Sequence, residues 1–371
     1  MMGRVRTWAF GVGLVALMAS TTSAATGTSR AEREETYEKL AIFARVLNHV
    51  QTAHVDATAP RDVVYAAIAG VMSELDPRSA FLPPEEVAAL RREALRAHFD
   101  FGFAWRRVGG DVVLTSVQPG SFAQRRGAVA GQRLVEIDGE PVPAGDDAVE
   151  DALYTLRGDA KLLRLVSTDG RESLVRLRFA ELKRPTVQAQ RLPGGAVHLA
   201  ISRFTEDTSA ELLRALEAHA GLTGLVLDLR GNPGGVVEAA ARTADAWLSS
   251  GLIATTEARN RTVEKFVAHA HGTEPAYPLV VLVDAETASA AELVAAALQE
   301  AGRARLVGTP TFGKGTVQTV IELEDGSAIR LTVSRWFTRA HGSVEGVGLT
   351  PDVVRPNPTE AFAAAVELAA K

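Results

Sequence analysis

The second half of the chain alternates between apolar strand-like runs and helical patterns, and this alternation constrains the fold most strongly. The runs GLVLDL (224–229) and PLVVLVD (278–284) are continuous and apolar, as in strands buried on both faces of a parallel sheet. The helical patterns cover residues of about 209–219, 236–248 and 290–301. We therefore predict an α/β core over residues 184–358, with a β-hairpin that turns at Asp325-Gly326.

The residues before this core follow two other patterns. Residues 32–96 have helical spacing, interrupted by LDPRSAFLPPEE at 75–86. Residues 97–183 contain short alternating strands, glycine turns and one helix near 147–156, which indicates a separate β-rich domain. The predicted organisation is a signal peptide (1–24), an N-terminal helical region (32–96), a β-rich domain (97–183), the α/β core (184–358) and a C-terminal helix (359–371).

The first residues have the features of a secretory signal. Two arginines precede an apolar run from Trp8 to Met18, and small residues offer cleavage after Ala24 or Ala25. The run is shorter than the roughly 20 residues that span a bilayer. We expect an exported protein with a cleaved signal peptide, periplasmic if the source is Gram-negative, with an uncleaved anchor as the alternative.

The residue inventory limits the chemistry. Removal of residues 1–24 takes two of the 40 basic residues and none of the 45 acidic ones, so the remaining chain has an excess of acidic residues. A chain with a net negative charge is not expected to bind nucleic acid. There are no cysteines, and the eight histidines form no HExxH motif. We expect no cofactor and no metal, since His269 and His271 lie in a polar stretch typical of solvated residues. Catalysis would have to use Ser, Thr, Lys, Asp or Glu.

Ser289 is the candidate nucleophile. It follows the run at 278–284 and precedes a helix, so backbone N–H groups without helical partners lie beside it. The sequence Ser289-Ala290-Ala291-Glu292 also fits a capping box, in which the serine only begins the helix and Glu292 bonds back to it. Within this segment both interpretations remain open.

Lys314 is the candidate general base. It lies between Gly313 and Gly315, so neighbouring side chains crowd it little. Lowering its pKa by about 3 units from about 10.4 requires about 4 kcal/mol of bias against the ammonium, which burial can supply. A neutral lysine could then take the serine proton. The alternative is a solvated loop lysine.

A glycine-rich turn could stabilise an oxyanion. GLVLDLRGNPGG (224–235) is a buried strand that ends in such a turn, and backbone N–H groups there can point into a cleft. The candidate donors are the amides of Gly234, Gly235 and Ala290, and loss of one such donor typically costs about 3 kcal/mol. A tight turn with no further role is equally compatible.

Taken together, these segments resemble the carboxy-terminal processing protease family, the Ser/Lys peptidases of tail-specific type that carry an inserted PDZ domain. The resemblance rests on TASAAE (287–292), a lysine 25 residues after the serine, and Gln318 four residues later. Further matching segments are LDPRSAFL (75–82), VLDLRGNPGG (226–235), YTLRG (154–158) and GVGLTPDVV (346–354).

The resemblance implies a ClpP/crotonase-like α/β core, an inserted PDZ domain and an N-terminal helical region. It implies Ser289 as nucleophile, Lys314 as base and Gln318 as the residue that positions the lysine. The PDZ loop that captures substrate tails would be Phe101-Gly102-Phe103-Ala104. Arg157 matches an arginine that couples the PDZ domain to the core. The chain departs from the family at Ala291, at Gly131-Gln132 and in the phenylalanines of that loop.

We therefore predict a serine endopeptidase that cleaves exported proteins near their carboxyl ends. The expected partners are proteins with exposed C-terminal tails, an adaptor or activator, and further copies of the chain. One alternative is a catalytically inactive, PDZ-containing peptide-binding or scaffolding protein of the same fold. Another is a nucleotide site at GTPTFGKG (308–315), but Gly315 replaces the Ser or Thr that would hold magnesium, and a strand follows.

Overall fold

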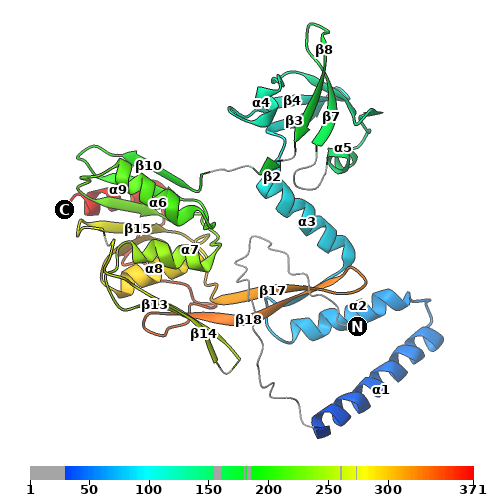
Figure 1. The fold of residues 1–371 in the computed structure, drawn as a ribbon. Helices are drawn as coiled ribbons and strands as arrows, with labels where there is room; N and C mark the ends of the chain where they lie inside the picture. The colour runs from blue at the N-terminus through cyan, green and yellow to red at the C-terminus, as the bar shows by residue number, and fades with distance from the viewer. Residues whose placement is uncertain (1–29, 154–159, 179, 182–184, 260, 273) are drawn as a thin grey trace. The chain divides into compact units, whose positions relative to one another are not determined.

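The computed structural model describes residues 30–153, 160–178, 180–181, 185–259, 261–272 and 274–371, and the chain divides into two compact units (Figure 1). One unit combines residues 1–87 with 185–371, and the other comprises residues 88–184. The inserted unit thus begins at residue 88, inside a helix, whereas the sequence analysis predicts that it begins at residue 97. The predicted signal peptide lies outside the described residues. None of the described helices is long and apolar enough to cross a membrane.

The larger unit contains the predicted α/β sheet. Its strand order is β10-β11-β12-β15-β16-β19, parallel throughout except for the antiparallel β10–β11 pair. The strands are β10 (Val187–Arg191), β11 (Val197–Ile201), β12 (Leu225–Asp228), β15 (Leu279–Val283), β16 (Arg305–Gly308) and β19 (Val353–Val354). All residues of β12 and β15 are buried, which explains their uninterrupted apolar sequences.

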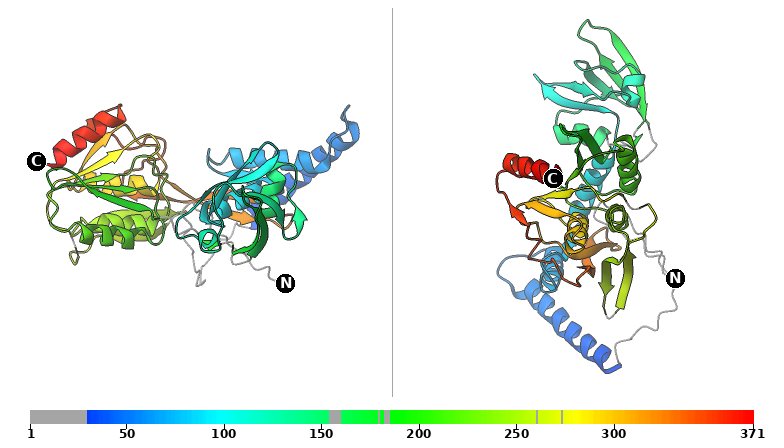
Figure 2. Two further views of the ribbon diagram at one scale, coloured as in Figure 1. Left: turned by 90° about the horizontal axis from the view of Figure 1, so that it is seen from above. Right: turned by 90° about the vertical axis from the view of Figure 1, so that its left-hand side faces the viewer.

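Helices cover both faces of this sheet (Figures 1 and 2). Because side chains alternate along a strand, Leu225 and Leu227 join one apolar cluster and Val226 joins another. The first cluster includes side chains of α6 (Thr208–Ala218), α7 (Val237–Asp245) and α8 (Ala290–Glu300), and the second includes α9 (Pro358–Ala369). All four helices lie within three residues of their predicted positions, and α8 ends one residue early.

A second sheet in this unit was only partly predicted. Its order is β1-β18-β13-β14, and β17 also pairs with β18. The strands are β1 (Ala80–Leu82), β13 (Leu252–Ala258), β14 (Arg261–Val267), β17 (Thr316–Glu322) and β18 (Ala328–Thr338). The β17–β18 hairpin confirms the predicted turn at Asp325-Gly326. The pairing of β1 with β18 was not predicted, and it brings residues 76–82 to the sheet that carries β17.

The N-terminal helices are α1 (Arg30–Ala53), α2 (Pro60–Ser73) and α3 (Pro84–His98). The break expected at 75–86 is present, and it contains β1. The Tyr65 hydroxyl of α2 donates a 2.6 Å hydrogen bond to Asp325 at the hairpin turn. This contact attaches α2 to the second sheet.

The inserted unit has its own sheet and its own core. The order is β3-β4-β5-β7-β8, with β6 paired to β5, and a two-stranded β2–β9 ladder is separate. The elements are β2 (Phe99–Asp100), β3 (Phe103–Val108), β4 (Asp111–Val117), α4 (Phe122–Arg125), β5 (Arg133–Ile137), β6 (Glu140–Pro141), α5 (Asp146–Leu153), β7 (Ala160–Val166), β8 (Glu172–Arg178) and β9 (Ala180–Glu181). Leu114, Leu163 and Leu177 are fully buried in this core.

Candidate active site

Ser289 stands at the start of α8, directly after the loop that follows β15. Its backbone has φ 56° and ψ −119°, and it is one of three non-glycine residues with positive φ in the described part of the chain. Such a conformation costs about 1–3 kcal/mol and persists only where the surroundings hold it. Side chains held in this way are frequent in active sites. The Ser289 N–H donates a 2.8 Å bond to Glu292, as the capping-box interpretation predicted.

Glu292 joins the serine segment to the lysine segment. Its side chain is fully buried and accepts four hydrogen bonds. One carboxylate oxygen, Oε2, accepts both the Ser289 N–H and the Lys314 N–H, each at 2.8 Å. The other, Oε1, accepts the Thr311 hydroxyl at 2.6 Å and the Gly313 N–H at 2.8 Å. The backbone nitrogens of Ser289 and Lys314 therefore lie at most twice 2.8 Å apart.

Lys314 lies in an environment that favours its neutral form. Burial lowers its pKa below the usual value, and the cationic side chains of Arg78 and Arg330 lower the pKa further. The Glu345 carboxylate acts in the opposite direction and raises the pKa of Lys314. A lowered lysine pKa means that a larger share of the amine is unprotonated near neutral pH, as a general base requires.

The backbone around Lys314 is held from two further directions. The Lys314 carbonyl accepts a 3.0 Å bond from the indole N–H of Trp336. The backbone N–H of Trp336 donates to the Gly315 carbonyl at 2.9 Å. The Gly315 N–H donates a 2.6 Å bond to Glu345. Trp336 is fully buried, so it also supplies part of the apolar surroundings of the loop. Phe312, two residues before the lysine, is 54% exposed.

The glycine turn after β12 lies against the serine. A Cβ added at Gly234 would approach the Ser289 Cβ and the Ala290 nitrogen to 2.9 Å, closer than a real Cβ tolerates. The Gly234 N–H is bonded to the side chain of Asn232 at 2.9 Å. The N–H groups of Gly235 and Ala290 have no hydrogen-bond partner among the described residues. The structure thus brings the three candidate donors together and leaves two of them free.

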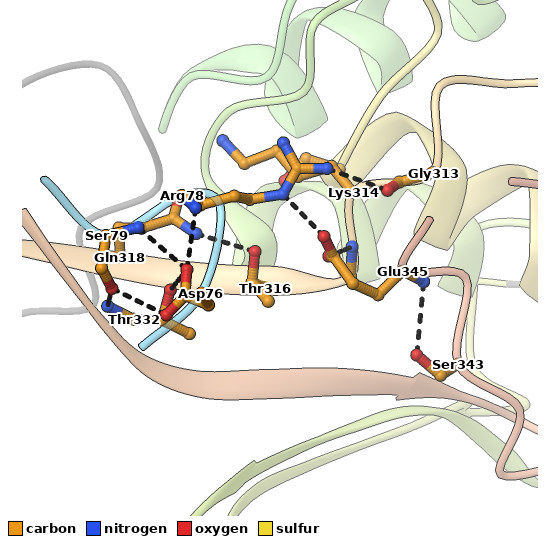
Figure 3. Close-up of polar contacts among 12 residues, drawn as sticks. Asp76, Arg78, Ser79, Gly313, Lys314, Thr316, Gln318, Thr332, Ser343 and Glu345 are labelled. Atoms are coloured by element: carbon orange, nitrogen blue, oxygen red, sulfur yellow. Dashed lines mark hydrogen bonds and ion pairs between the residues drawn. The ribbon is translucent and has the colours of Figure 1, made fainter. Parts of the chain in front are cut away.

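Two predicted contacts are not formed. No hydrogen bond joins the Ser289 hydroxyl to the Lys314 amine within the described ranges. Gln318 is buried in β17, but its amide donates to the Thr316 hydroxyl at 2.7 Å and not to Lys314 (Figure 3). The structure therefore brings the backbones of the serine and the lysine together, while their side chains are not hydrogen-bonded to each other.

The predicted tail-binding loop lies in the inserted unit. Phe101 and Phe103 are buried in its core and stack at 5.9 Å between ring centres. Gly102 has φ 86°, and its carbonyl accepts the Gln118 N–H, while Ala104 is exposed on β3. Arg157 lies outside the described residues.

Three residues around the lysine were not predicted to take part in the site: Arg78, Trp336 and Glu345. Arg78 and Glu345 flank or fall within quoted motifs, LDPRSAFL and GVGLTPDVV, but the motifs do not reveal which strand they approach. Trp336 is one of only four tryptophans, and a tryptophan in a hairpin strand is an ordinary core residue. Their contacts with the lysine loop arise from the tertiary fold.

Comparison with known proteins gives consistent relatives. Residues 196–355 match peptidase family S41. The chain is 30% identical over 364 residues to a carboxy-terminal-processing protease of Bartonella bacilliformis, covering 95% of this chain and 83% of that protein. It is 30% identical to the carboxy-terminal processing protease CtpA of Bacillus subtilis, with 89% and 70% covered. A solved photosystem II D1 C-terminal processing protease is similar with a TM-score of 0.52 and 27% identity, over 89% of this chain and 97% of that one.

Replacement of Glu292 tests the link between the two segments. Glu292→Ala leaves two buried and two partly buried donors without their acceptor, and each unsatisfied buried group costs about 1–3 kcal/mol. We expect the free energy of unfolding, measured by urea denaturation, to fall by at least about 3 kcal/mol. The control Glu238→Ala removes an exposed carboxylate that pairs with Arg242, and should change the free energy of unfolding by about 0.5 kcal/mol or less. Equal effects of the two substitutions would contradict the proposed link.

Proposed function

The chain belongs to the carboxy-terminal-processing proteases of peptidase family S41, which are serine peptidases, and we propose that it cleaves exported proteins near their C-termini with Ser289 as nucleophile and Lys314 as general base. One observation carries this proposal: a single oxygen of Glu292 binds the backbone N–H groups of both residues. The strained conformation of Ser289 and the lowered pKa of Lys314 add support.

The proposed reaction proceeds through an acyl-enzyme. Neutral Lys314 takes the proton of the Ser289 hydroxyl as its oxygen attacks the substrate carbonyl. The N–H groups of Ala290 and Gly235 donate to the oxyanion of the tetrahedral intermediate. The intermediate collapses, the C–N bond breaks, and protonated Lys314 gives its proton to the leaving amine. Water, deprotonated by Lys314, then hydrolyses the ester and restores Ser289.

Gln318 has a conditional part in this proposal. Its buried amide lies on β17, four residues after Lys314, and is bonded to Thr316. We propose that a change of its side-chain rotamer directs the amide to Lys314 and orients the amine toward Ser289. The arrangement without a Ser289–Lys314 hydrogen bond would then be a resting form. The N–H of Gly234 is bonded to Asn232, so we do not propose it as an oxyanion donor. Gly234 contributes instead because it has no side chain and allows the turn to lie close to Ser289.

We further propose that the inserted unit is a PDZ domain on a ClpP/crotonase-like core. β3 lies at the edge of its sheet among the described strands, so its outer backbone groups are available to an added peptide strand. The Phe101–Ala104 segment leads into β3, which begins at Phe103. This is the position at which a PDZ domain captures a terminal carboxylate in backbone N–H groups. Arg157 would couple this domain to the core.

We also propose that the protein is exported and that it acts with partner proteins. The apolar run at Trp8–Met18 supports export with a cleaved signal peptide, to the periplasm in a Gram-negative cell. We propose an adaptor or activator protein as a partner. We also propose that copies of the chain assemble through their terminal helices. The inactive scaffolding alternative has no specific observation in its favour.

Loss of either catalytic group should abolish cleavage. Ser289→Ala and Lys314→Met, in the chain without residues 1–24, are each expected to lower kcat/KM on an unstructured polypeptide with an apolar tail by at least about 10³-fold. Because the pKa of Lys314 is lowered, wild-type kcat/KM should rise with pH through a value below lysine's usual pKa of about 10.4. The exposed controls Ser249→Ala and Lys265→Met should retain full activity. Undiminished cleavage by Ser289→Ala or Lys314→Met would refute the mechanism.

The proposed tail recognition can be measured without catalysis. The Ser289→Ala protein should bind a fluorescent peptide with an apolar C-terminal residue more tightly than the same peptide with an amidated C-terminus. Loss of the carboxylate should weaken binding about tenfold or more in fluorescence anisotropy, which corresponds to about 1.4 kcal/mol. Equal affinity for the two peptides would show that the insert does not capture a terminal carboxylate.

A further inference from the structure

Arg78 contacts both the lysine loop and a carboxylate that binds the same loop. Its Nε donates a 2.7 Å bond to Glu345 Oε1, and one of its terminal nitrogens donates a 3.0 Å bond to the Gly313 carbonyl (Figure 3). Its guanidinium carbon lies 5.3 Å from the centre of the Phe312 ring. The side chains of Arg78 and Glu345 are 23% and 26% exposed, so this is a half-buried ion pair.

The ion pair brackets Lys314. Arg78 binds the carbonyl of Gly313, the residue before the lysine, and Glu345 Oε2 accepts the N–H of Gly315, the residue after it. Each partner therefore fixes one flank of the lysine, and the bond between the partners connects the two flanks. A planar guanidinium can make both contacts at once because its N–H groups diverge in a fixed geometry.

Arg78 is itself held in place by its own segment and by β18. Its backbone N–H and that of Ser79 both donate to Asp76 Oδ1 at 2.8 Å. The hydroxyl of Thr332 on β18 donates to the same oxygen at 3.1 Å, and Arg330 Nε donates to the Arg78 carbonyl at 3.1 Å. The backbone that carries Arg78 is thus attached to the sheet that carries the lysine loop.

We propose that Arg78 is a positioning residue for Lys314, which it holds in place together with Glu345 while presenting a fixed positive charge to the lysine amine. This inference rests on the proposed role of Lys314 as general base. Arg78 acts through the lysine and needs no contact with substrate.

The charges around the amine predict opposite effects for the two partners. Among the described residues, Arg78 before β1, Glu345 before β19 and Glu292 on α8 bond to the lysine loop. The charge of Arg330 on β18 also acts on the Lys314 amine, and Asp76 binds the backbone of Arg78. Arg78 lowers the pKa of Lys314 and Glu345 raises it. Neutralising Arg78 should therefore raise the lysine pKa and move the acidic limb of the activity profile to higher pH. Neutralising Glu345 should move that limb to lower pH.

The two variants share one structural defect, which makes the comparison decisive. Arg78→Gln and Glu345→Gln both break the ion pair, so a purely structural role would alter activity in both without shifting the limb in opposite directions. For this partly exposed pair we expect displacements of about 0.5 pH unit in each direction, or roughly threefold in kcat/KM at a fixed pH on the limb. The measurement is kcat/KM against pH for the chain without residues 1–24.

Two further variants complete the experiment. Arg78→Lys keeps the charge but not the two divergent contacts, so its limb should stay at the wild-type pH while kcat/KM falls. Arg61→Gln removes an exposed arginine paired with Glu85 on the same N-terminal segment and should leave the profile unchanged. Displacement of the limb in the same direction by Arg78→Gln and Glu345→Gln, or no displacement, would overturn the inference. Activity in Lys314→Met would instead refute the proposed function.

Discussion

The architecture of the candidate active site depends on the buried carboxylate of Glu292. A carboxylate without partners would be strongly destabilising at a position with no solvent exposure, but four donors satisfy this one. Two of these donors belong to Ser289 and Lys314, which come from segments separated by 25 positions. Formation of the folded core therefore brings the two backbones together. The link uses the backbone N–H groups of the pair, so it does not depend on how their side chains are arranged.

The sheets explain why these segments meet. Ser289 follows β15 and Gly234 follows β12, and these parallel neighbours end at the same edge. Lys314 precedes β17 in the second sheet, whose other members include β1 from the N-terminal segment. The first sheet thus supplies the proposed nucleophile and the free amides, and the second supplies the proposed base together with Arg78.

Local sequence patterns predicted the features that depend on local structure. The buried run before Ser289 and the Ser-Ala-Ala-Glu sequence placed the start of α8 correctly, and Asp325-Gly326 marked the β17–β18 turn. Ser289 proved compatible with both of its interpretations, because its capping interaction with Glu292 is the same one that reaches Lys314. The close approach of Gly234 to Ser289 agrees with the adjacency expected for the glycine turn.

Long-range pairing could not be predicted in this way. β1 has three residues, too few to show a period, and its partner β18 lies about 250 positions away. The sequence therefore does not predict that Arg78 bonds to the Gly313 carbonyl. The β13–β14 hairpin, which follows a helical pattern in the sequence, was also not predicted. The bond of Gln318 to Thr316 depends on a side-chain rotamer, which sequence spacing does not determine.

The most direct test of the account is the site and rate of covalent labelling by a fluorophosphonate, followed by mass spectrometry of the digested protein. The account predicts a single adduct on the peptide that contains Ser289, formed faster as pH rises, and formed at least about tenfold more slowly in Lys314→Met. Labelling at another residue, or equal rates of Ser289 labelling with and without the lysine amine, would contradict the claim that Lys314 activates Ser289.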